Sequence, residues 1–452
     1  MPTVTLVYPY FRPFSDNSIF RFPPLGLGYI AAYLKRHGVT VDLVDCTFLG
    51  QDKALDRIRS SHPQIIGIQS VFSMERKSLE LAKMLRKNCE LLVAGGPLPT
   101  SNPTDFLEDF DIVVIGEGEE TMLEIVQTVE RGTSLSRVKG IAYEADGKTT
   151  FTAAREFIGD LDALPFPARN FFDNKTYQNY YSKSYGYTTT SLMTSRGCPF
   201  NCDFCSRPVF GNCFRTRSAA NIVDEIEEIQ SLGYNRVWFA DDCFTIDRNR
   251  LIALCNEIIR RHLRIGWECL SRGDTVDVGV IEIMKQAGCV RVFFGIESGN
   301  NSVLALMKKQ VTTQQARKAV QVVKEANVQV GAFFIVGYPG ESDETVLDTV
   351  KFASSLPVDY LSFTLPYPIP GTPLYDRVRQ RLVLEEWEEP KNPSLVKHKL
   401  MFTSSFSEKK LKFAIAKGMM QSWIRKYLKA KGYKLIGEPF EILTDSVFRH
   451  MH

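Results

Sequence analysis

The sequence predicts an α/β protein with three parts: an N-terminal doubly wound parallel sheet, a partial (β/α)6 barrel and a helical C-terminal region. Three observations predict this architecture. The chain has 452 residues, which is too many for one ordinary core. Apolar strand patterns alternate with amphipathic helix patterns from residue 3 to about 130. A second alternation of the same kind begins near Thr188.

The first alternation opens with the apolar stretch "TVTLVYPY", which predicts a strand from Thr3. "LGLGYIAAYLKRHG" then predicts a helix with Lys35 and Arg36 in its last turn and Gly38 at its end. Strand and helix patterns follow one another as far as "EETMLEIVQTVER". Sheets of this kind bind ligands at the carboxyl ends of their strands. The segments that follow these strands are therefore the candidate binding loops.

The chain between the two alternations has a different composition. "DLDALPFPARNFF" is rich in Pro and aromatic residues, and "NKTYQNYYSKSYGY" is rich in Tyr. We interpret this part as a connector. The expected boundaries are 1–131 for a Rossmann-like domain, 132–187 for the connector, 188–380 for the barrel and 381–452 for the C-terminal region.

Six strand patterns separated by helical stretches predict the partial barrel. They are "TTSLMTS", "RVWFAD", "IGWECLS", "VRVFFGIE", "QVGAFFIVG" and "DYLSFTLPYP". Barrels of parallel strands carry their chemistry at the carboxyl ends of the strands. The residues that end each of these six patterns are therefore the first place to look for a site.

Composition narrows the possible partners. The net charge is +3, which gives no general case for nucleic-acid or membrane binding. No stretch approaches the roughly 20 apolar residues of a membrane span. The first residues lack the pattern of a cleavable leader. We expect a cytoplasmic protein with no membrane span and no nucleic-acid partner.

Three cysteines stand together in "SRGCPFNCDFCSRP": Cys198, Cys202 and Cys205, directly after the first barrel strand. A cytoplasmic chain of this size is not held by disulfides, so the cluster indicates metal ligation. A structural zinc takes four protein ligands, and a four-iron cluster is usually held by four thiolates. Three thiolates would leave one iron open to a small molecule. The alternative is a zinc site with a distant fourth ligand. Isolated cysteines such as Cys46 and Cys255 are expected to be buried and inert.

This spacing, C-x3-C-x2-C with Phe204 before the last cysteine, resembles the radical S-adenosylmethionine (SAM) superfamily over residues 188 to 375. The resemblance implies that the three cysteines hold a 4Fe–4S cluster whose open iron binds SAM. It also implies an electron donor such as ferredoxin or flavodoxin. The SAM contacts that it implies are Phe204, Asp241 in "FADDCF", Arg272 in "CLSRGD", Glu297 and Ser298 in "FFGIESGN", and Gly337 in "FIVGYPGE". The alternative for Arg272 and Glu297 is a buried ion pair.

The N-terminal part is similar to the cobalamin-binding domains of one branch of that superfamily, which extends the resemblance to residues 3 to 375. The matching stretches are "FPPLGLGYIAAYLKRHG", "IIGIQSVFS", "VAGGPLPT" and "DIVVIGEGEET". The cobalamin contacts that the resemblance implies are Ser70, Val71, Gly95, Gly96, Gly116, Glu117 and Gly118. The motif D-x-H-x-x-G is absent, which implies cobalt without a histidine ligand from the protein. "GEGEET" lacks the third Gly of a dinucleotide loop and the Lys of a P-loop, so it does not favour nucleotide binding.

The segment "SEKKLKFAIAKGMMQSWIRKYLKAKGYK" predicts a long helix near the C-terminus. Leu411, Ile415, Met419, Trp423 and Tyr427 recur every four residues, which predicts one apolar face. We expect this face to pack on the barrel while the lysines form a solvated basic face. The alternative is that the basic helix docks on an acidic macromolecule or a membrane surface.

The resemblance implies a cobalamin-dependent radical SAM methyltransferase that transfers a methyl group to an unactivated carbon of a peptide, protein or small molecule. A protein-glutamine C-methyltransferase of methanogens is one candidate relative. The alternative is carbon–carbon bond formation or cyclisation without methyl transfer. A non-catalytic corrinoid carrier is disfavoured by the cysteine cluster. A methylthiotransferase would need a second cysteine cluster, and the N-terminal part holds only Cys46 and Cys89. No catalytic residue is assigned.

Overall fold

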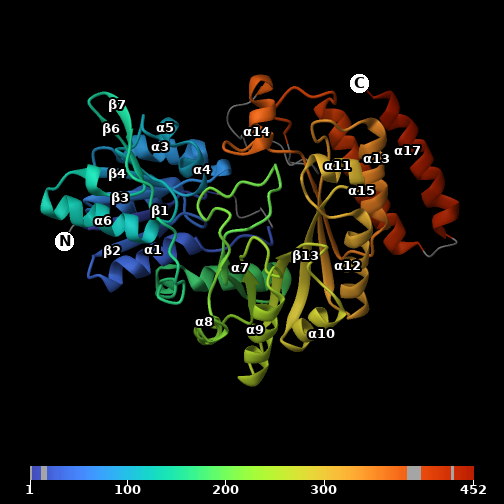
Figure 1. Cartoon of the computed structure of the whole chain (residues 1–452), viewed down its shortest axis with the longest axis horizontal. Helices are drawn as coiled ribbons and strands as arrows, with labels where there is room; N and C mark the ends of the chain where they lie inside the picture. Colours follow the sequence, from blue (N-terminus) through green and yellow to red (C-terminus); the bar gives the residue numbers. More distant parts are fainter. Residues whose placement is uncertain (1–2, 12–17, 384–398, 429–431, 452) are drawn as a thin grey trace. The chain divides into compact units, whose positions relative to one another are not determined.

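The computed structural model describes residues 3–11, 18–383, 399–428 and 432–451, which form two compact units (Figure 1). The first unit comprises residues 1–199 and 206–238, and the second comprises 200–205 and 239–452. In the described residues, we find no helix with the length and apolar composition that crossing a bilayer requires.

The first unit is built around a seven-stranded sheet with the order β2-β1-β3-β4-β5-β6-β7. Strands β1 to β5 are parallel, as predicted. β2 lies on one side of β1, and β3 to β5 follow in order on the other side, so the strand order reverses between β1 and β3. Strands β6 and β7 add an antiparallel hairpin beside β5. The bounds are β1 Val4–Tyr8, β2 Val41–Asp45, β3 Ile65–Gln69, β4 Leu91–Gly95, β5 Ile112–Val114, β6 Ile141–Ala145 and β7 Lys148–Phe151.

Helices cover both faces of this sheet, so it has two separate cores. On one face α1 and α6 lie side by side and bury residues such as Leu34 and Ile125 against the strands (Figure 1). On the other face α2 and α3 bury residues such as Ile58 and Leu81. The bounds are α1 Leu25–Arg36, α2 Gln51–Ser60, α3 Glu75–Leu85, α4 Pro97–Ser101, α5 Pro103–Phe106 and α6 Gly118–Arg131.

The stretch expected to be a connector carries regular structure. It contains the hairpin β6–β7 and the tyrosine-rich helix α7, Asn174–Tyr185. Tyr177 and Tyr181 are fully buried, and the Tyr177 hydroxyl donates a hydrogen bond to Asp45 Oδ2 (2.7 Å). Tyr177 therefore ties α7 to β2 of the first sheet. The rest of the unit consists of β8 Thr189–Leu192, β9 Ser195–Arg196, β10 Arg215–Thr216, α8 Ala219–Ser231 and β11 Arg236–Phe239.

The second unit holds four parallel strands that lie beside one another in chain order, β12 to β15. Their bounds are β12 Gly266–Ser271, β13 Cys289–Glu297, β14 Gln329–Ile335 and β15 Tyr360–Thr364. The helices around them are α9 Arg248–Arg260, α10 Val278–Gln286, α11 Asn301–Leu306, α12 Thr313–Glu325, α13 Asp343–Ser355 and α14 Pro373–Val378. All six strands predicted for the second alternation are therefore present as β8, β11 and β12 to β15. The boundaries at 131 and 187 stay a prediction.

The C-terminal region contains α15 Glu408–Tyr427, a π-helical turn at Tyr433–Gly437, and α17 Glu438–His450. Helix α15 packs against α13, as expected for a helix on the barrel. The face that it buries differs from the predicted one. Leu411 and Ile415 are buried, but Met419, Trp423 and Tyr427 are 45%, 62% and 64% exposed.

The reason for this difference is the helical period. An α-helix turns once every 3.6 residues, so each four-residue step rotates about 40° past the core. The buried face of α15 instead follows Ala414, Gly418, Gln421 and Ile424. The basic face is also only partly solvated, because Lys410 and Lys417 are buried and pair with Asp343 (2.9 Å) and Asp445 (2.6 Å).

Candidate functional site

The first cysteine of the motif lies in the first unit, just beyond the short strand β9. Gly197 precedes it with φ of 84°, and a Cβ at this position would overlap the carbonyl oxygen of Cys213. The Cys198 amide donates to the Gly211 carbonyl (3.3 Å), and Arg207 Nη1 donates to the Cys198 carbonyl (2.8 Å). Glycine is therefore required by both backbone angle and space where the chain turns into the cysteine loop.

The other two cysteines belong to the second unit, where Asp203 fixes the backbone between them. Asp203 is fully buried, and its carboxylate bonds with the Tyr338 hydroxyl and the Arg377 guanidinium. Its amide donates to the Met307 carbonyl (3.1 Å), and its carbonyl accepts from the Leu374 amide (2.9 Å). Four contacts to three different segments hold this short stretch.

The thiols themselves have the chemistry of an iron–sulfur donor set. Cys198 and Cys202 are buried, Cys205 is half-buried, and none of the three forms a disulfide with another described residue. Within the part of the chain that the structure describes, no three His, Cys, Asp or Glu side chains are gathered closely enough to hold a metal ion. Soft thiolates suit iron–sulfur clusters. The assignment of the three ligands therefore rests on residue type and spacing.

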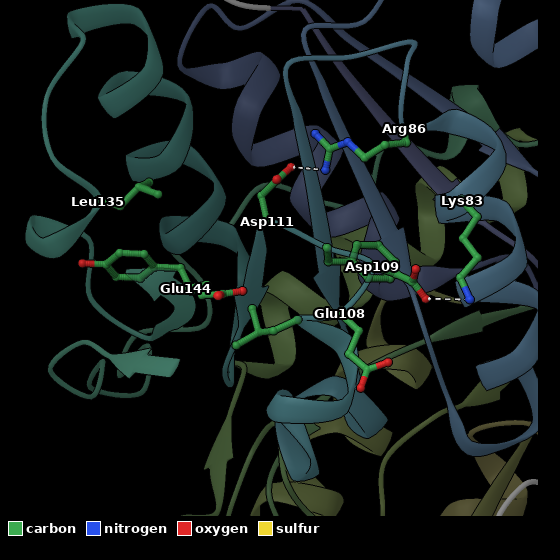
Figure 2. A pocket seen from close by; sticks show the side chains of 10 residues that line it. Lys83, Arg86, Glu108, Asp109, Asp111, Leu135 and Glu144 are labelled. Carbon is green, nitrogen blue, oxygen red and sulfur yellow. Dashed lines mark hydrogen bonds and ion pairs between the residues drawn. The ribbon is translucent and has the colours of Figure 1, made fainter. Parts of the chain in front are cut away.

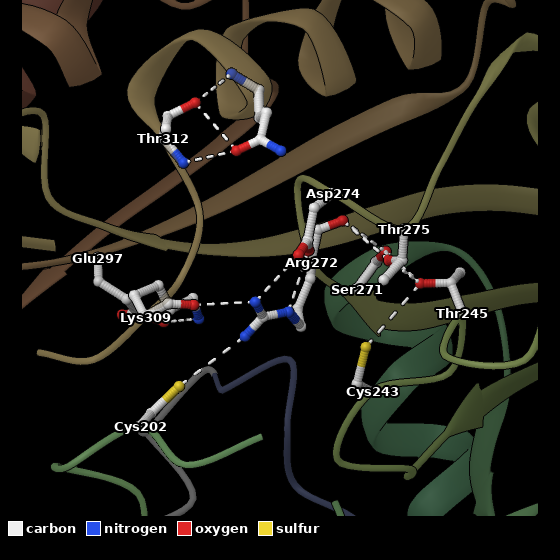
Figure 3. Close-up of polar contacts among 11 residues, drawn as sticks. Cys202, Cys243, Thr245, Ser271, Arg272, Asp274, Thr275, Glu297, Lys309 and Thr312 are labelled. Carbon is white, nitrogen blue, oxygen red and sulfur yellow. Dashed lines mark hydrogen bonds and ion pairs between the residues drawn. The ribbon is translucent and has the colours of Figure 1, made fainter. Parts of the chain in front are cut away.

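Two of the predicted SAM contacts, Arg272 and Glu297, lie near Lys309 and Cys202 (Figure 3). Arg272 Nη1 lies 3.9 Å from Cys202 Sγ, and Arg272 Nη2 donates to the Lys309 carbonyl (2.9 Å). Lys309 Nζ pairs with Glu297 Oε1 (2.9 Å) and lies 5.9 Å from the centre of the Phe204 ring. Phe204, Arg272 and Glu297 are thus neighbours, as a shared binding site requires.

The alternative of an Arg272–Glu297 ion pair is wrong. Arg272 pairs with Asp274 (3.0 Å) and lies 3.6 Å from the centre of the Phe200 ring, while Glu297 pairs with Lys309. Burial lowers the pKa of the Lys309 ammonium, but Glu297 and Cys202 raise it, and the net pKa is above the usual value. The cluster therefore pairs two cations, Arg272 and Lys309, with two carboxylates, Asp274 and Glu297, and its charges balance.

The remaining three predicted SAM contacts have structural partners of their own. Ser298 Oγ lies 2.9 Å from Thr349 Oγ1 and accepts from the Asn300 amide (3.1 Å). Asp241 is buried and pairs with Arg250 (3.7 Å). Gly337 has φ of 82°, and a Cβ there would overlap the Leu411 side chain of α15. Their roles as SAM contacts stay a prediction.

The segments that contain "FADDCF" and "CLSRGD" meet through three hydroxyl groups, two of which directly follow the motifs (Figure 3). Thr245 Oγ1 lies 2.6 Å from Ser271 Oγ and 2.6 Å from Thr275 Oγ1, and Cys243 Sγ lies 3.9 Å from Thr245 Oγ1. Thr245 and Ser271 are buried. This contact fixes the loop after β11 beside the turn that carries Arg272.

The predicted cobalamin loops follow β3, β4 and β5 in the first unit. Ser70 Oγ and Gln69 Oε1 are buried and, among the described residues, have no hydrogen-bond partner. A Cβ at Gly95 would meet only Val114 Cβ, at 3.8 Å, among the described residues. Gly96 has φ of 106°, and a Cβ there would lie 2.7 Å from the Ser70 carbonyl oxygen. Open space at Gly95 beside unpaired polar groups fits a polar ligand at the carboxyl ends of these strands.

The third cobalamin loop differs, because one of its predicted contacts is already engaged. Gly116 has φ of 86°, and its nearest neighbour is the Val209 carbonyl, 3.8 Å from a Cβ position. A Cβ at Gly118 would lie 2.7 Å from Ile30 Cδ1. Glu117 between them is buried and pairs with Arg196 (2.6 Å) and Arg215 (2.9 Å). Val71, after Ser70, begins a 3₁₀ turn as its N-cap.

A separate cavity of about 520 Å³ lies in the first unit, away from the predicted ligand loops (Figure 2). It is lined by the end of α3, the segment before β5, and β6. Lys83 pairs with Asp109 (3.3 Å) and Arg86 pairs with Asp111 (2.7 Å) across its wall. It therefore faces the amino ends of the strands, whereas the predicted ligand loops follow the carboxyl ends.

Most of the isolated cysteines are buried, as predicted, whereas Cys89 is half-buried and Cys213 is exposed. Cys46 and Cys255 are fully buried, and burial raises the pKa of the Cys46 thiol above its usual range and that of Cys255 to about 12. Sequence reasoning missed Lys309, Asp203 and Arg196, whose ionic partners lie between 12 and 174 residues away in the chain. Only their position beside the cysteine motif or a barrel strand distinguished them from other charged residues.

Two family models match the chain. The model described as "B12 binding domain" matches residues 16–126, and the model described as "Radical SAM superfamily" matches residues 192–353. The first match covers most of the parallel part of the first sheet. The second begins in β8 and includes the three cysteines of the motif.

Named relatives and one solved structure agree with both matches. An uncharacterised methyltransferase of Pyrococcus horikoshii is 33% identical over 95% of this chain and 90% of its own length. The anaerobic magnesium-protoporphyrin IX monomethyl ester cyclase of Rubrivivax gelatinosus is 29% identical over 85% of this chain and 72% of its own length. The radical SAM methyltransferase TsrM of Kitasatospora setae, solved with cobalamin and a 4Fe–4S cluster, has a TM-score of 0.71 at 19% identity, covering 84% and 75% of the two chains. The predicted fold class is confirmed.

Proposed function

Because the chain belongs to the cobalamin-binding branch of the radical SAM superfamily, we propose that it transfers a methyl group to an unactivated carbon of a peptide, protein or small molecule. Its cofactors are a 4Fe–4S cluster, SAM and cobalamin. When bound, these groups supply the methyl group and the radical chemistry that opens a carbon–hydrogen bond.

The residues that would hold the cluster are Cys198, Cys202 and Cys205. Among the described residues, none of them is tied up in a disulfide. Asp203 fixes the backbone between the second and third of them, and Gly197 allows the turn before the first. The protein's task at this loop is to keep the backbone fixed while the thiolates bind.

The residues that would receive SAM are the charged and aromatic groups beside Cys202. Arg272 and Lys309 offer positive charge to a carboxylate, and Glu297 offers negative charge to an amino group. Phe204 supplies an apolar face next to Lys309. These side chains would bind and orient the amino-acid end of SAM against the cysteine loop.

Cobalamin would be received by the loops that follow β3 and β4. The Ser70 hydroxyl, which has no partner among the residues that the structure describes, supplies a hydrogen-bond donor, and Gly95 leaves space that any larger side chain would fill. In the part of the chain that the structure describes, no histidine follows these strands, which favours cobalt without a histidine ligand from the protein.

The observation that carries methyl transfer is the relative named a methyltransferase, which matches this chain across both domains. A second candidate is ring formation without methyl transfer. The relative named a cyclase, which matches 85% of the chain, favours it. In either case we expect a small electron-transfer protein such as ferredoxin or flavodoxin to supply electrons.

The deciding experiment is anaerobic incubation of the reconstituted protein with methyl-labelled SAM and candidate substrates, followed by mass spectrometry. Methyl transfer predicts label in the product, with S-adenosylhomocysteine and deoxyadenosine in equal amounts. Unlabelled product, with deoxyadenosine alone, would replace methyl transfer by ring or bond formation.

A matched pair of variants tests the cobalamin loop. Gly95→Leu fills the open space after β4 and should abolish retention of cobalamin, measured by its absorption, while iron content stays normal. Gly132→Leu, at an exposed helix end with nothing near its Cβ position, is the control. Normal corrinoid retention by Gly95→Leu would remove this loop from the binding site.

A further inference from the structure

The loop after β5 is bound to the strand that leads into the cysteine motif. Glu117 in this loop is buried, and Arg196 Nη1 donates to its Oε1 (2.6 Å). Arg215 Nη1 lies 3.0 Å from Oε1 and 2.9 Å from Oε2, and the Ile158 amide donates to Oε2 (2.8 Å). Four contacts therefore occupy both oxygens of one carboxylate.

The two arginines belong to one structural element. Arg196 on β9 and Arg215 on β10 are directly paired in a two-stranded antiparallel ribbon. Arg196 is two residues before Cys198, and Gly197 between them has a left-handed backbone that admits no side chain. A shift of Arg196 is therefore passed directly to the backbone of the first cysteine.

A second carboxylate and two aromatic rings complete the setting of Arg196. Glu119 Oε1 accepts from Arg196 Nη2 (2.5 Å), so the guanidinium bridges Glu117 in the loop and Glu119 in the first turn of α6. The rings of Tyr29 and Phe210 lie 5.3 Å and 5.0 Å from its central carbon. The two buried carboxylates match the two buried guanidiniums in charge. A planar guanidinium that donates to two fixed acceptors has little freedom to rotate.

The next glutamate along the chain provides a contrast. Glu120 pairs with Arg155 (3.1 Å), but its side chain is 42% exposed, and Arg155 belongs to the segment after β7. Glu120 therefore has the same charge and nearly the same position in the chain, without a link to the β9–β10 ribbon.

We propose that Glu117 is a positioning residue for the cysteine loop rather than a cobalamin contact. Its carboxylate clamps the β9–β10 ribbon to the loop after β5, so the cobalamin loop and the backbone of Cys198 are mechanically coupled. Both carboxylate oxygens of Glu117 already accept hydrogen bonds from the protein, so neither is offered to a corrinoid. The neighbouring Gly116 has space next to its backbone. That these loops bind cobalamin and an iron–sulfur cluster rests on the proposed function, whereas the contacts between Glu117 and the β9–β10 ribbon do not.

The test compares Glu117→Gln with Glu120→Gln. In the metal-free chain, hydrogen exchange of peptides covering 197–216 should speed up at least tenfold in Glu117→Gln and stay unchanged in Glu120→Gln. After anaerobic reconstitution, bound iron per chain should fall at least twofold in Glu117→Gln only. Its affinity for hydroxocobalamin, titrated by absorption, should change less than twofold.

A tenfold or greater loss of hydroxocobalamin affinity in Glu117→Gln, with unchanged exchange in 197–216, would overturn the proposal and make Glu117 a cobalamin contact. If Glu117→Gln does not fold, Glu117→Asp is scored in the same way, because its shorter side chain keeps the charge but not the reach. If the unmodified chain binds no corrinoid, the proposed function is in error, and exchange in the metal-free chain still decides whether the clamp exists.

Discussion

The Tyr338 hydroxyl is hydrogen-bonded to the carboxylate of Asp203, and both residues are fully buried. Burial, together with the Asp203 carboxylate, raises the pKa of Tyr338 far above its usual value, so the phenol remains a donor. Tyr338 follows β14, and Asp203 lies between Cys202 and Cys205. The end of a central barrel strand thus fixes the second half of the cysteine motif.

Removing either partner should loosen that half of the motif. Tyr338→Phe leaves the buried Asp203 without one donor, which costs about 1–3 kcal/mol of unfolding free energy. We expect faster hydrogen exchange over residues 200–205 and quicker loss of iron in air. Asp203→Asn should behave similarly, whereas Asp376→Asn, at an exposed position of α14, should match the unmodified protein. Equal exchange in Tyr338→Phe and the unmodified chain would show that the contact contributes nothing.

The cysteine variants should divide into two groups. Ala in place of Cys198, Cys202 or Cys205 should abolish the visible absorption of the reconstituted cluster and the formation of deoxyadenosine. Cys213→Ala, at an exposed position eight residues after the motif, should keep both. A Cys213→Ala protein without a cluster would place a fourth thiolate at the site and leave no open iron.

A pair of glycine variants separates backbone strain from steric overlap. Gly132 and Gly197 both have left-handed φ, of 61° and 84°. Ala at Gly132 meets nothing within 4 Å, so it should cost only about 1 kcal/mol for the backbone angle. Ala at Gly197 would also overlap the Cys213 carbonyl, so it should cost several times more and reduce iron binding. Urea unfolding measures the loss of stability in each variant. Similar losses in both variants would contradict the overlap at Gly197.

Glu341 should make the second unit less stable as the pH rises. Burial raises the pKa of its carboxyl from 4.5 to about 7, although the Tyr338 amide donates to Oε2 (2.7 Å). Oε1 has no hydrogen-bond partner among the described residues. The folded state therefore holds a proton that the unfolded state releases. Stability from this group is full below pH 4.5 and is lost as the pH rises to about 7, by ~3 kcal/mol.

Glu341→Gln keeps the size and removes the charge. Unfolding in urea at pH 5 and pH 8 should show a smaller pH dependence for this variant and a higher stability at pH 8. The same slope in both proteins would mean that Glu341 titrates near its ordinary pKa.

Hydrophobic periodicity was enough to predict every strand of both alternations, because strands buried on both faces read as continuous apolar runs. It was not enough for α15. A spacing of four residues is close to the helical period over one turn, but after four steps the side chains have rotated about 160° from the first. Tyr427 therefore points away from the face that contains Leu411.

The ion-pair partners of charged residues are the second feature that the sequence does not predict. The motif "CLSRGD" singled out Arg272, which lies beside Cys202, but nothing in its spacing shows that Lys309 pairs with Glu297. In the same way "GEGEET" marked a loop at the end of β5. The pairing of Glu117 with Arg196 follows from a third element, β9, whose place is decided by tertiary packing. Short motifs locate backbone loops, whereas the direction of each side chain depends on neighbours far away in sequence.

The Glu117 clamp also has a consequence for synthesis of the chain. Its partners Arg196 and Arg215 lie 79 and 98 residues further along. At about 5–20 residues per second, the ribosome needs roughly 5–20 s to add the second of them. During that interval the five parallel strands are complete, yet two glutamates destined for the interior have no counter-charge. We expect the N-terminal sheet to stay open to protease on ribosome-bound chains that end at residue 180, and to become protected on chains that extend well beyond Arg215.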